Sequence, residues 1–400
     1  MNNWYLLAAI PVFGLLIVVH ELGHFLTAKW AGIRVEEFGL GLPPAIVGFR
    51  KRDRGGWEVL WFGQGRDLQE NTQTPLSGAS GGVSAGAETS QHTIYSLNLL
   101  PIGGFVRMPG ETGDMYDAEG HYDEGSFAAK SAGKRIIVLC AGVLMNVILA
   151  MILFTVAYTT GEPTFPPVIG QVQAGSPASQ AGLKANDKII SINGQSVASF
   201  DDVVTQVDQA ITNSHAKSGN VPVRLQVQHK GMRAPVAITV NAQVSPPANQ
   251  GHLGVVRGPT VFVHSPAWQA PFKGIVQTFT TTRQFLVGIE QMIVGAIQPQ
   301  LLGPVGIVKL TGQVAQSTPD LGLWPILNFT AILSLNLAIV NILPFPALDG
   351  GRVVLVLIEV LRGGKRLKPE REGIINLVGM ALLLTLMVAI TVSDVVHWGG

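Results

Sequence analysis

Four long apolar stretches constrain this chain most strongly. They cover residues 4–30, 136–158, 321–345 and 374–392. A helix needs about 20 apolar residues to cross a bilayer, and each stretch is close to that length or longer. Open strands and loops would leave backbone groups unpaired in hydrocarbon, so stretches of this kind are expected to be helices. The sequence therefore predicts a polytopic α-helical membrane protein with four transmembrane helices.

Composition agrees with a membrane protein. Only 13% of the residues are charged, about half the share of roughly 25% in globular proteins. A net charge of +1 gives no reason to expect a nucleic-acid partner. Cys140 is the single cysteine, which excludes an intrachain disulfide and a thiolate-rich zinc site. The first stretch lacks a basic leader and a small-residue cleavage site, so we expect a retained span.

Basic residues near the stretch ends predict the orientation. Lys and Arg cluster within 34–54, 130–135 and 362–371. Cytoplasmic loops of membrane proteins carry an excess of Lys and Arg. Both connections that hold these clusters are therefore expected in the cytoplasm, with the termini and residues 161–320 outside.

The first connection alternates between structured and unstructured segments. Residues 33–50 are mildly apolar but interrupted by Gly and Pro, and residues 57–62 are strand-like. Residues 63–91 are rich in Gly, Ser, Thr and Gln, which predicts a flexible loop. Residues 93–108 indicate a β-hairpin or looped pair of strands, and an acidic surface loop follows at 109–130.

The outer region contains a small α+β domain at 161–245. Strand-like segments cover 168–172, 188–192, 221–229 and 234–240, and helical segments cover 178–183 and 200–211. The following segment, 246–320, includes helix-like residues 268–297, where apolar residues alternate with Thr, Gln, Arg and Glu. That helix is too polar to span easily and fits an interfacial amphipathic helix. Residues 1–160 and 321–400 are the two membrane halves.

Residues 20–24 match the pattern H-E-x-x-H. Residues four apart share one face of a helix, so His20 and His24 can bind one Zn²⁺. Zinc lowers the pKa of a bound water toward ~7, and Glu21 lies where it can take that water's proton. An accidental match on a solvated helix is the competing interpretation. Charged and imidazole side chains are costly inside a membrane stretch and usually functional, which favours the metal site.

A catalytic zinc needs a third protein ligand. Asp349 is the candidate, because it follows the third stretch and emerges near the membrane depth of His20, toward the cytoplasmic side. Pro344 and Pro346 should interrupt the helix before it. An N-cap role for a helix at 353–361 explains Asp349 equally well from the residues alone.

The chain resembles the site-2 protease family, in its bacterial regulator-of-sigma-E protease form. The matching motifs lie at residues 20–24, 101–108, 303–307 and 341–351, in family order. The resemblance implies that Asp349 is the third zinc ligand. It implies an intramembrane zinc metalloprotease in the bacterial cytoplasmic (inner) membrane, with the lipid bilayer around it.

The resemblance also implies how substrate is held. Asn336 and Asn341 would bind the substrate backbone, although hydrogen bonding between helices is an alternative role for them. Residues 101–108, with Gly103 and Gly104, resemble a membrane-re-entrant β-loop that pairs with an unwound substrate. A plain surface hairpin is the alternative for that segment.

The outer domain resembles a PDZ domain over residues 174–194. Asn186 stands where many relatives carry Gly, and Asn tolerates the left-handed conformation that this turn requires. A PDZ domain here is expected to filter substrates by size, and binding of peptide ends is a second role.

The expected reaction is hydrolysis within or near the transmembrane segments of single-span proteins, after a first extracytoplasmic cut. Anti-sigma factors and remnant signal peptides are the substrates that the resemblance implies. Two other classes compete: a membrane metal-binding or transport protein that uses the same His and Asp residues, and a membrane-anchored PDZ scaffold. Zinc content and cleavage of a generic single-span substrate separate the three.

Overall fold

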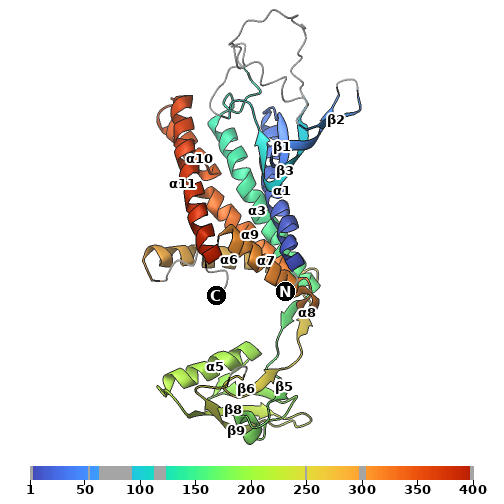
Figure 1. The fold of residues 1–400 in the computed structure, drawn as a ribbon, viewed down its shortest axis with the longest axis vertical. Coiled ribbons are helices and arrows are strands. Elements are labelled where there is room, and N and C mark those ends of the chain that lie inside the picture. Colours follow the sequence, from blue (N-terminus) through green and yellow to red (C-terminus); the bar gives the residue numbers. More distant parts are fainter. Residues whose placement is uncertain are drawn as a thin grey trace, which may run out of the picture. The chain divides into compact units, whose positions relative to one another are not determined.

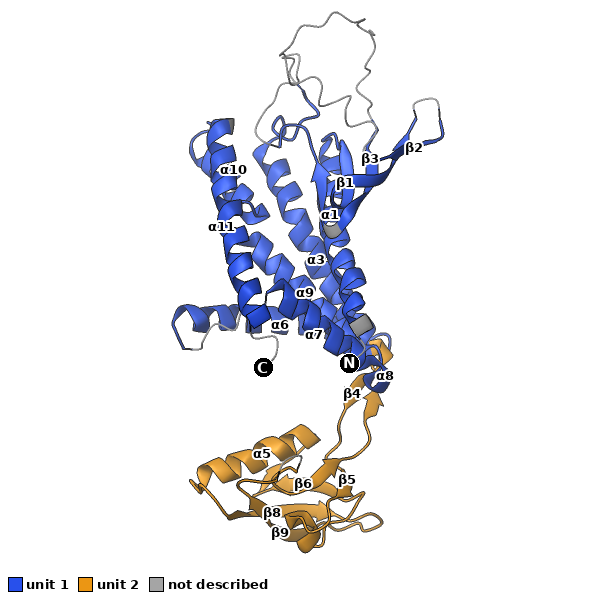
Figure 2. Cartoon of the chain, viewed as in Figure 1, with its two compact units in different colours: residues 1–158, 266–400 blue, residues 159–265 orange. Residues whose placement is uncertain are grey.

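The chain forms two compact units, which are coloured separately in Figure 2. Unit 1 comprises residues 1–158 and 266–400, and unit 2 comprises residues 159–265. The computed structural model describes residues 3–52, 55–62, 92–111, 123–247, 250–296 and 303–396. The loop expected to be flexible at 63–91 lies outside the described residues.

Unit 1 is built around four helices that are long and apolar enough to cross a membrane (Figure 1). They are α1 (Ala9–Ala31), α3 (Ala132–Thr160), α9 (Trp324–Ile342) and α11 (Pro369–Val396). These helices confirm that the four predicted stretches are helical and long enough to span a bilayer. The shorter helices of unit 1 are η1 (Asn3–Ala8), α6 (Ala270–Ile293), α7 (Pro304–Gln316), α8 (Thr318–Leu321) and α10 (Asp349–Leu361).

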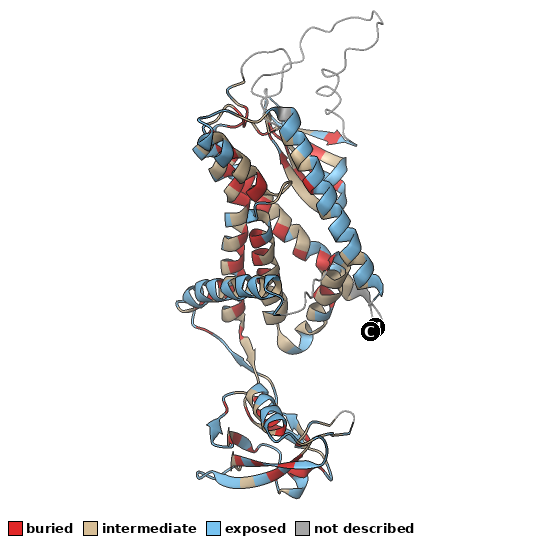
Figure 3. Cartoon of the chain, turned by 90° about the vertical axis from the view of Figure 1, so that its left-hand side faces the viewer, coloured by how far each residue is buried: buried red, intermediate tan, exposed pale blue. Residues whose placement is uncertain are grey.

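The helices α1, α3 and α9 share an apolar core. Phe154, Leu16 and Leu335 are fully buried there. Gly23 of α1 lies so close to α3 that a Cβ atom would be 2.7 Å from the carbonyl carbon of Ala141. The helix α11 differs, because most of its apolar side chains are exposed (Figure 3). In a bilayer those side chains would contact lipid.

The chain reverses tightly between α9 and α10. Proline removes a backbone donor and clashes with the preceding turn, so α9 ends at Ile342 before Pro344 and Pro346. A Cβ on Gly351 would lie 2.7 Å from the carbonyl carbon of Phe345, so this reversal requires glycine. The predicted interruption of the helix is confirmed, and α10 starts at Asp349.

A sheet of β1 (Glu37–Lys51), β2 (Trp57–Trp61) and β3 (Ile94–Arg107) follows α1. The strand β1 folds around the first half of β3, because Ile94 pairs with both Glu37 and Arg50. Gly39 in turn pairs with Ser96 on one side and Phe105 on the other. Residues 104–107 therefore form an edge segment of this sheet, with residues 37–40 as their paired neighbours.

Unit 2 contains a four-stranded antiparallel sheet with the order β7-β6-β8-β9. Its strands are β6 (Lys188–Ile192), β7 (Gln195–Ser196), β8 (Asn220–Gln228) and β9 (Val236–Gln243). The helices are α4 (Pro177–Gln180) and α5 (Phe200–Asn213), and α5 begins with a capping box between Ser199 and Asp202. Valine and isoleucine side chains of α5, β6 and β8 fill the core. Asn186 has a φ of 69°, the left-handed conformation expected for it.

Two further strand pairs extend unit 2 beyond the expected boundary at 245. The strand β10 (Val255–Arg257) pairs with β5 (Ile169–Val172), and β11 (Val261–Val263) pairs with β4 (Glu162–Thr164). These antiparallel pairs bring residues 255–263 back to the start of the domain. The unit therefore ends at residue 265, about twenty residues later than the composition indicated.

Candidate metal centre

The two histidines of the H-E-x-x-H pattern lie on one face of α1. His20 and His24 are both 7% exposed, and their Nε2 atoms are 3.3 Å apart. A helix turn separates them, so their imidazoles point to one location. Their burial against α3 and α9 requires a partner for each ring nitrogen.

Asp349 completes this cluster. Its Oδ2 atom lies 3.2 Å from Nε2 of His20 and 3.3 Å from Nε2 of His24. Asp349 is the first residue of α10, Leu348 is the N-cap residue, and no side-chain hydrogen bond caps this helix. The carboxylate thus points to the histidines rather than to the end of its own helix.

These three atoms fit a zinc ion. Ligands about 2.0–2.1 Å from a tetrahedral zinc are separated by about 3.3 Å, which matches all three distances. Nε2 of His24 carries a lone pair, because Nδ1 of that ring lies 2.8 Å from the carbonyl oxygen of Val138 and donates to it. Lone pairs of a nitrogen and a carboxylate at this distance repel unless a cation lies between them. The cluster is the one group of metal-ligating side chains found among the described residues.

Three positions of α3 support the histidines. Val138 provides the carbonyl for His24, and the Nδ2 atom of Asn146 lies 3.3 Å from Nδ1 of His20. Between them, a Cβ on Gly142 would lie 2.7 Å from Cε1 of His20. The sequence interpretation named none of these residues. One signal was present, because Asn146 is the sole side-chain amide in α3 and amides are costly in a membrane helix.

A cavity of about 250 Å³ opens beside the cluster. Six of the eight residues that the sequence indicated as site residues line it: His20, Glu21, Gly103, Gly104, Asn341 and Asp349. His24 is buried behind the cavity with its Nε2 atom at the cluster. The Nδ2 atom of Asn341 lies 3.4 Å from Nε2 of His20, whereas Asn336 is half-buried and does not line the cavity.

The edge segment of the sheet closes one side of this cavity. A Cβ on Gly104 would lie 2.9 Å from Cγ2 of Ile17 and 3.0 Å from Cγ of Glu21. The backbone at Gly104 therefore lies so close to the side chain of Glu21 that no larger residue fits between them. Gly103 has a φ of 86°, which strongly favours glycine at the turn before the edge segment.

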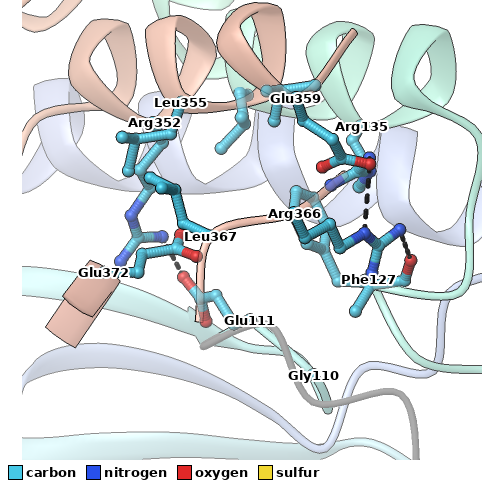
Figure 4. A pocket seen from close by; sticks show the side chains of 13 residues that line it. Gly110, Glu111, Phe127, Arg135, Arg352, Leu355, Glu359, Arg366, Leu367 and Glu372 are labelled. Carbon is cyan, nitrogen blue, oxygen red and sulfur yellow. Dashed lines mark hydrogen bonds and ion pairs between the residues drawn. The ribbon is translucent and has the colours of Figure 1, made fainter. Parts of the chain in front are cut away.

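Charged side chains hold α10, which begins with Asp349, in place (Figure 4). Arg352, one turn after Asp349, forms an ion pair with Glu111, four residues beyond β3. Arg135 of α3 donates to Glu359 at 2.7 Å, and Arg366 donates to the same carboxylate at 3.1 Å. These contacts surround a cavity of about 40 Å³. They link the α10 helix to α3 and to the sheet.

One carboxyl group near the site, that of Glu359, has a lowered pKa. Burial raises the pKa of Glu359, but the hydrogen bonds from Arg135 and Arg366 bring it below its usual range. Glu359 is therefore a carboxylate at neutral pH.

Known proteins are similar to this sequence over nearly its whole length. The model of peptidase family M50 matches residues 8–65 and 82–386. The chain belongs to peptidase family M50. The M50 relatives include the zinc metalloprotease RasP of Geobacillus kaustophilus, which is 30% identical over 98% of this chain and 97% of the relative.

Two more M50 relatives match over similar lengths. A probable protease, Eep, of Enterococcus faecalis is 34% identical over 96% of this chain and 97% of its own. The regulator of sigma-W protease RasP of Bacillus subtilis is 28% identical over 97% of both chains. The M50 chain described here is accordingly a multi-pass membrane zinc metalloprotease, and Zn²⁺ is its metal.

Proposed function

We propose that this chain is an intramembrane protease that hydrolyses peptide bonds within or near transmembrane segments of single-span proteins. The observation that supports it best is the set of 3.2–3.3 Å distances among His20, His24 and Asp349, with both histidines on an apolar, membrane-length helix. In this proposal these three side chains hold zinc. A first extracytoplasmic cut precedes the reaction, and the substrates include anti-sigma factors, in line with the name of the Bacillus subtilis relative.

Glu21 is the proposed general base. Zinc held by the three ligands would polarise the scissile carbonyl and acidify the attacking water. Glu21 lines the same cavity and lies one residue after a ligand, so its carboxylate reaches a water there. It takes the proton of the water and then passes it to the leaving amine nitrogen.

The substrate backbone is proposed to lie between Asn341 and the edge segment 104–107. A helix hides its peptide bonds, so the substrate must unwind near the cavity before cleavage. An unwound segment can add to a sheet edge through main-chain hydrogen bonds. Asn341 lines the same cavity as Gly104 of this edge, which suits it to hold a substrate carbonyl. Asn336 would act earlier along α9, at a position that the cavity does not reach.

Replacing Glu21 tests this proposal. The Glu21→Gln protein should bind zinc as the native protein does, because the three ligands remain. Cleavage of a single-span reporter in proteoliposomes should fall by at least about 10²-fold, the lower range for loss of a general base. Glu124→Gln, at an exposed position, is the control and should cleave normally.

Each other outcome has a clear meaning. Cleavage retained in Glu21→Gln would remove Glu21 from its role as base. Zinc bound stoichiometrically without cleavage by the native protein would favour a metal-binding or transport function instead.

Unit 2 is proposed to be an extracytoplasmic PDZ domain that admits only substrates with a trimmed outer domain. Its support is the resemblance at 174–194 and its separation into a compact unit. Reporters that share one transmembrane segment and carry outer domains of increasing size test this role. Cleavage should fall as the outer domain grows, and equal cleavage of all reporters would contradict a size filter.

The helix α6 is proposed to lie in the outer membrane interface. It runs across the spans rather than along them (Figures 1 and 3). It packs on α3 through Gly274, whose Cβ would lie 2.9 Å from the carbonyl oxygen of Met151. Along the axis of α3, Gly142 at the metal cluster and the residues that contact Gly274 are roughly 15–20 Å apart, at about 1.5 Å per residue. Phe272, Phe279 and other apolar residues of α6 are exposed on one side.

The aromatic residues beside α6 are typical of the boundary between lipid and water. The ring of Tyr158 lies 5.0 Å from that of Trp324, and its hydroxyl donates to Gln277 of α6 at 3.2 Å. Nζ of Lys273 lies 5.3 Å from the Tyr158 ring. Tyr and Trp are enriched at the boundary between lipid and water, and lysine reaches toward the headgroups. A helix at this level with one apolar side fits an interfacial position.

Spin labels test the position of α6. In a Cys140→Ala background, a nitroxide at Phe279→Cys should be accessible to oxygen, which concentrates in lipid. A nitroxide at Gln284→Cys, on the other side of the helix, should be accessible to a water-soluble relaxation agent. Equal accessibility of the two positions to the aqueous agent would contradict an interfacial α6.

A further inference from the structure

The side-chain amide of Asn146 is deeply buried beside the metal cluster. Asn146 has no exposed surface, and its Nδ2 atom lies 3.3 Å from Nδ1 of His20. Within the described part of the chain, its Oδ1 atom has no hydrogen-bond partner. The nitrogen and oxygen of an amide are assigned from their hydrogen bonds. Turning this amide over places Oδ1 against Nδ1 of His20, where it accepts the ring N–H. The proposed zinc selects this orientation, because a ligating histidine must keep the lone pair on Nε2 and therefore its proton on Nδ1.

This hydrogen bond determines which nitrogen of His20 faces the cluster. A neutral imidazole carries one proton, so a proton held on Nδ1 by Asn146 leaves the lone pair on Nε2. Nε2 is the atom that lies 3.2 Å from Oδ2 of Asp349. His24 is oriented in the same way, since its Nδ1 atom donates to the carbonyl of Val138.

One face of α3 therefore contacts and orients both imidazole rings. Val138, Gly142 and Asn146 are spaced four residues apart and lie above one another on the helix. The first holds His24, the second leaves room for both imidazoles, and the third holds His20. Ser334 of α9 also contacts this residue, but its Oγ donates to the backbone carbonyl of Asn146 at 2.7 Å and not to the side-chain amide.

We infer that Asn146 is a positioning residue, which holds His20 in the tautomer and orientation that bind zinc. The inference rests on the proposed zinc ligands. Partners that orient a ligating histidine typically contribute a factor of about 10–100 to metal affinity. Asn146 touches neither substrate nor metal in this role, and acts through His20 alone.

Zinc affinity of the full-length protein in detergent, measured by competition with a chelator, tests the inference. Asn146→Leu removes the acceptor and should weaken zinc binding by about 10–100-fold. Asn146→Asp keeps an acceptor oxygen and should bind zinc at least as tightly as the native protein. With Co²⁺ in place of zinc, Asn146→Leu should also change the ligand-field spectrum, and Asn146→Asp should restore it.

Ser334→Ala is the matched control. It removes a hydrogen bond to the backbone of the same residue but leaves the amide in place, so zinc affinity should stay native. Native affinity in Asn146→Leu, or equal weakening in Asn146→Asp and Asn146→Leu, would overturn the inference. Failure of the native protein to bind zinc would instead overturn the proposed function, so the two failures are distinguishable.

Discussion

At the scale of single residues, the metal centre depends on space as much as on ligands. Gly142 faces both imidazoles, and a Cβ there would lie 2.7 Å and 2.9 Å from Cε1 and Nδ1 of His20. Real Cβ atoms do not approach other atoms so closely. A methyl group at this position would move the ring that must converge with His24 and Asp349.

Gly142→Ala should therefore weaken zinc binding by at least about 10-fold, comparable with loss of an orienting partner. Gly133→Ala is the control, because a Cβ at Gly133 meets nothing within 4 Å and gains the same helix propensity. Chelator competition on both proteins checks this. Equal zinc affinities would show that the histidines adjust to an added methyl group.

Much of the metal centre was predictable at this scale. His20, Glu21 and His24 form a motif that carries its own geometry, so their convergence followed from helical spacing. Asp349 could not be decided from the residues alone, since a ligand and an N-cap have the same sequence signature. Asn146 and Gly142 were missed because their roles depend on which face of α3 meets α1, which is a tertiary contact.

At the scale of elements, the Glu359 carboxylate is one of the groups that hold α10 in place. Glu359 accepts hydrogen bonds from Arg135 of α3 and from Arg366 after α10. Its pKa is lowered in the folded protein, so these contacts stabilise the fold at pH values above about 4.5. That stability is lost as the pH falls through the lowered pKa of the folded state.

Glu359→Gln should lower the free energy of unfolding at pH 7 by up to about 3 kcal/mol, because two arginines lose their anion. Its melting temperature should also fall less steeply than that of the native protein as the pH drops below about 4.5. Thermal unfolding in detergent measures both. Glu370→Gln, at an exposed position in α11, should behave like the native protein, and an unchanged melting temperature in Glu359→Gln would contradict this role.

The edge segment 104–107 gives a second prediction at this scale. Gly104→Ala would push the strand away from Ile17 and Glu21, because a Cβ lies 2.9–3.0 Å from their side chains. Misplacing a positioning element by about 1 Å can reduce a rate about 10²-fold. Cleavage of the reporter should fall while zinc affinity stays native. Loss of zinc together with activity would indicate a collapsed site instead.

The elements themselves were predicted unevenly. The strand at 188–192 and the helices starting near 200 and 270 follow local patterns of apolar residues, and the structure has them within a few residues. The strand β1 was not predicted, because Gly39, Gly41, Pro43 and Pro44 interrupt its pattern. The first part of β1, from Glu37 to Ala45, pairs with β3, which lies more than forty residues later in the chain, so its strand structure depends on a distant pairing.

At the scale of the whole molecule, orientation in the membrane is the main prediction. The basic clusters within 34–54, 130–135 and 362–371 predict that two connections lie in the cytoplasm and that unit 2 lies outside. Lys217 belongs to unit 2, and Lys365 lies between α10 and α11. Both lysines are exposed, so they form a matched pair.

In a Cys140→Ala background, Lys217→Cys should react with a membrane-impermeant maleimide on intact bacterial spheroplasts. Lys365→Cys should react only after the membrane is opened. Mass shifts of the labelled protein measure both. The reverse pattern would place unit 2 in the cytoplasm and contradict both the size filter and the inner-membrane orientation.

The edge strand beside Glu21 has a consequence for how targets would be chosen. Main-chain hydrogen bonds read backbone shape and are almost blind to side-chain identity. A protease that captures substrates this way would prefer those whose helices need the least free energy to unwind. Glycine, β-branched residues and proline near the cut would then matter more than any consensus sequence. The targets of such an enzyme would be recognised by a shared weakness of secondary structure.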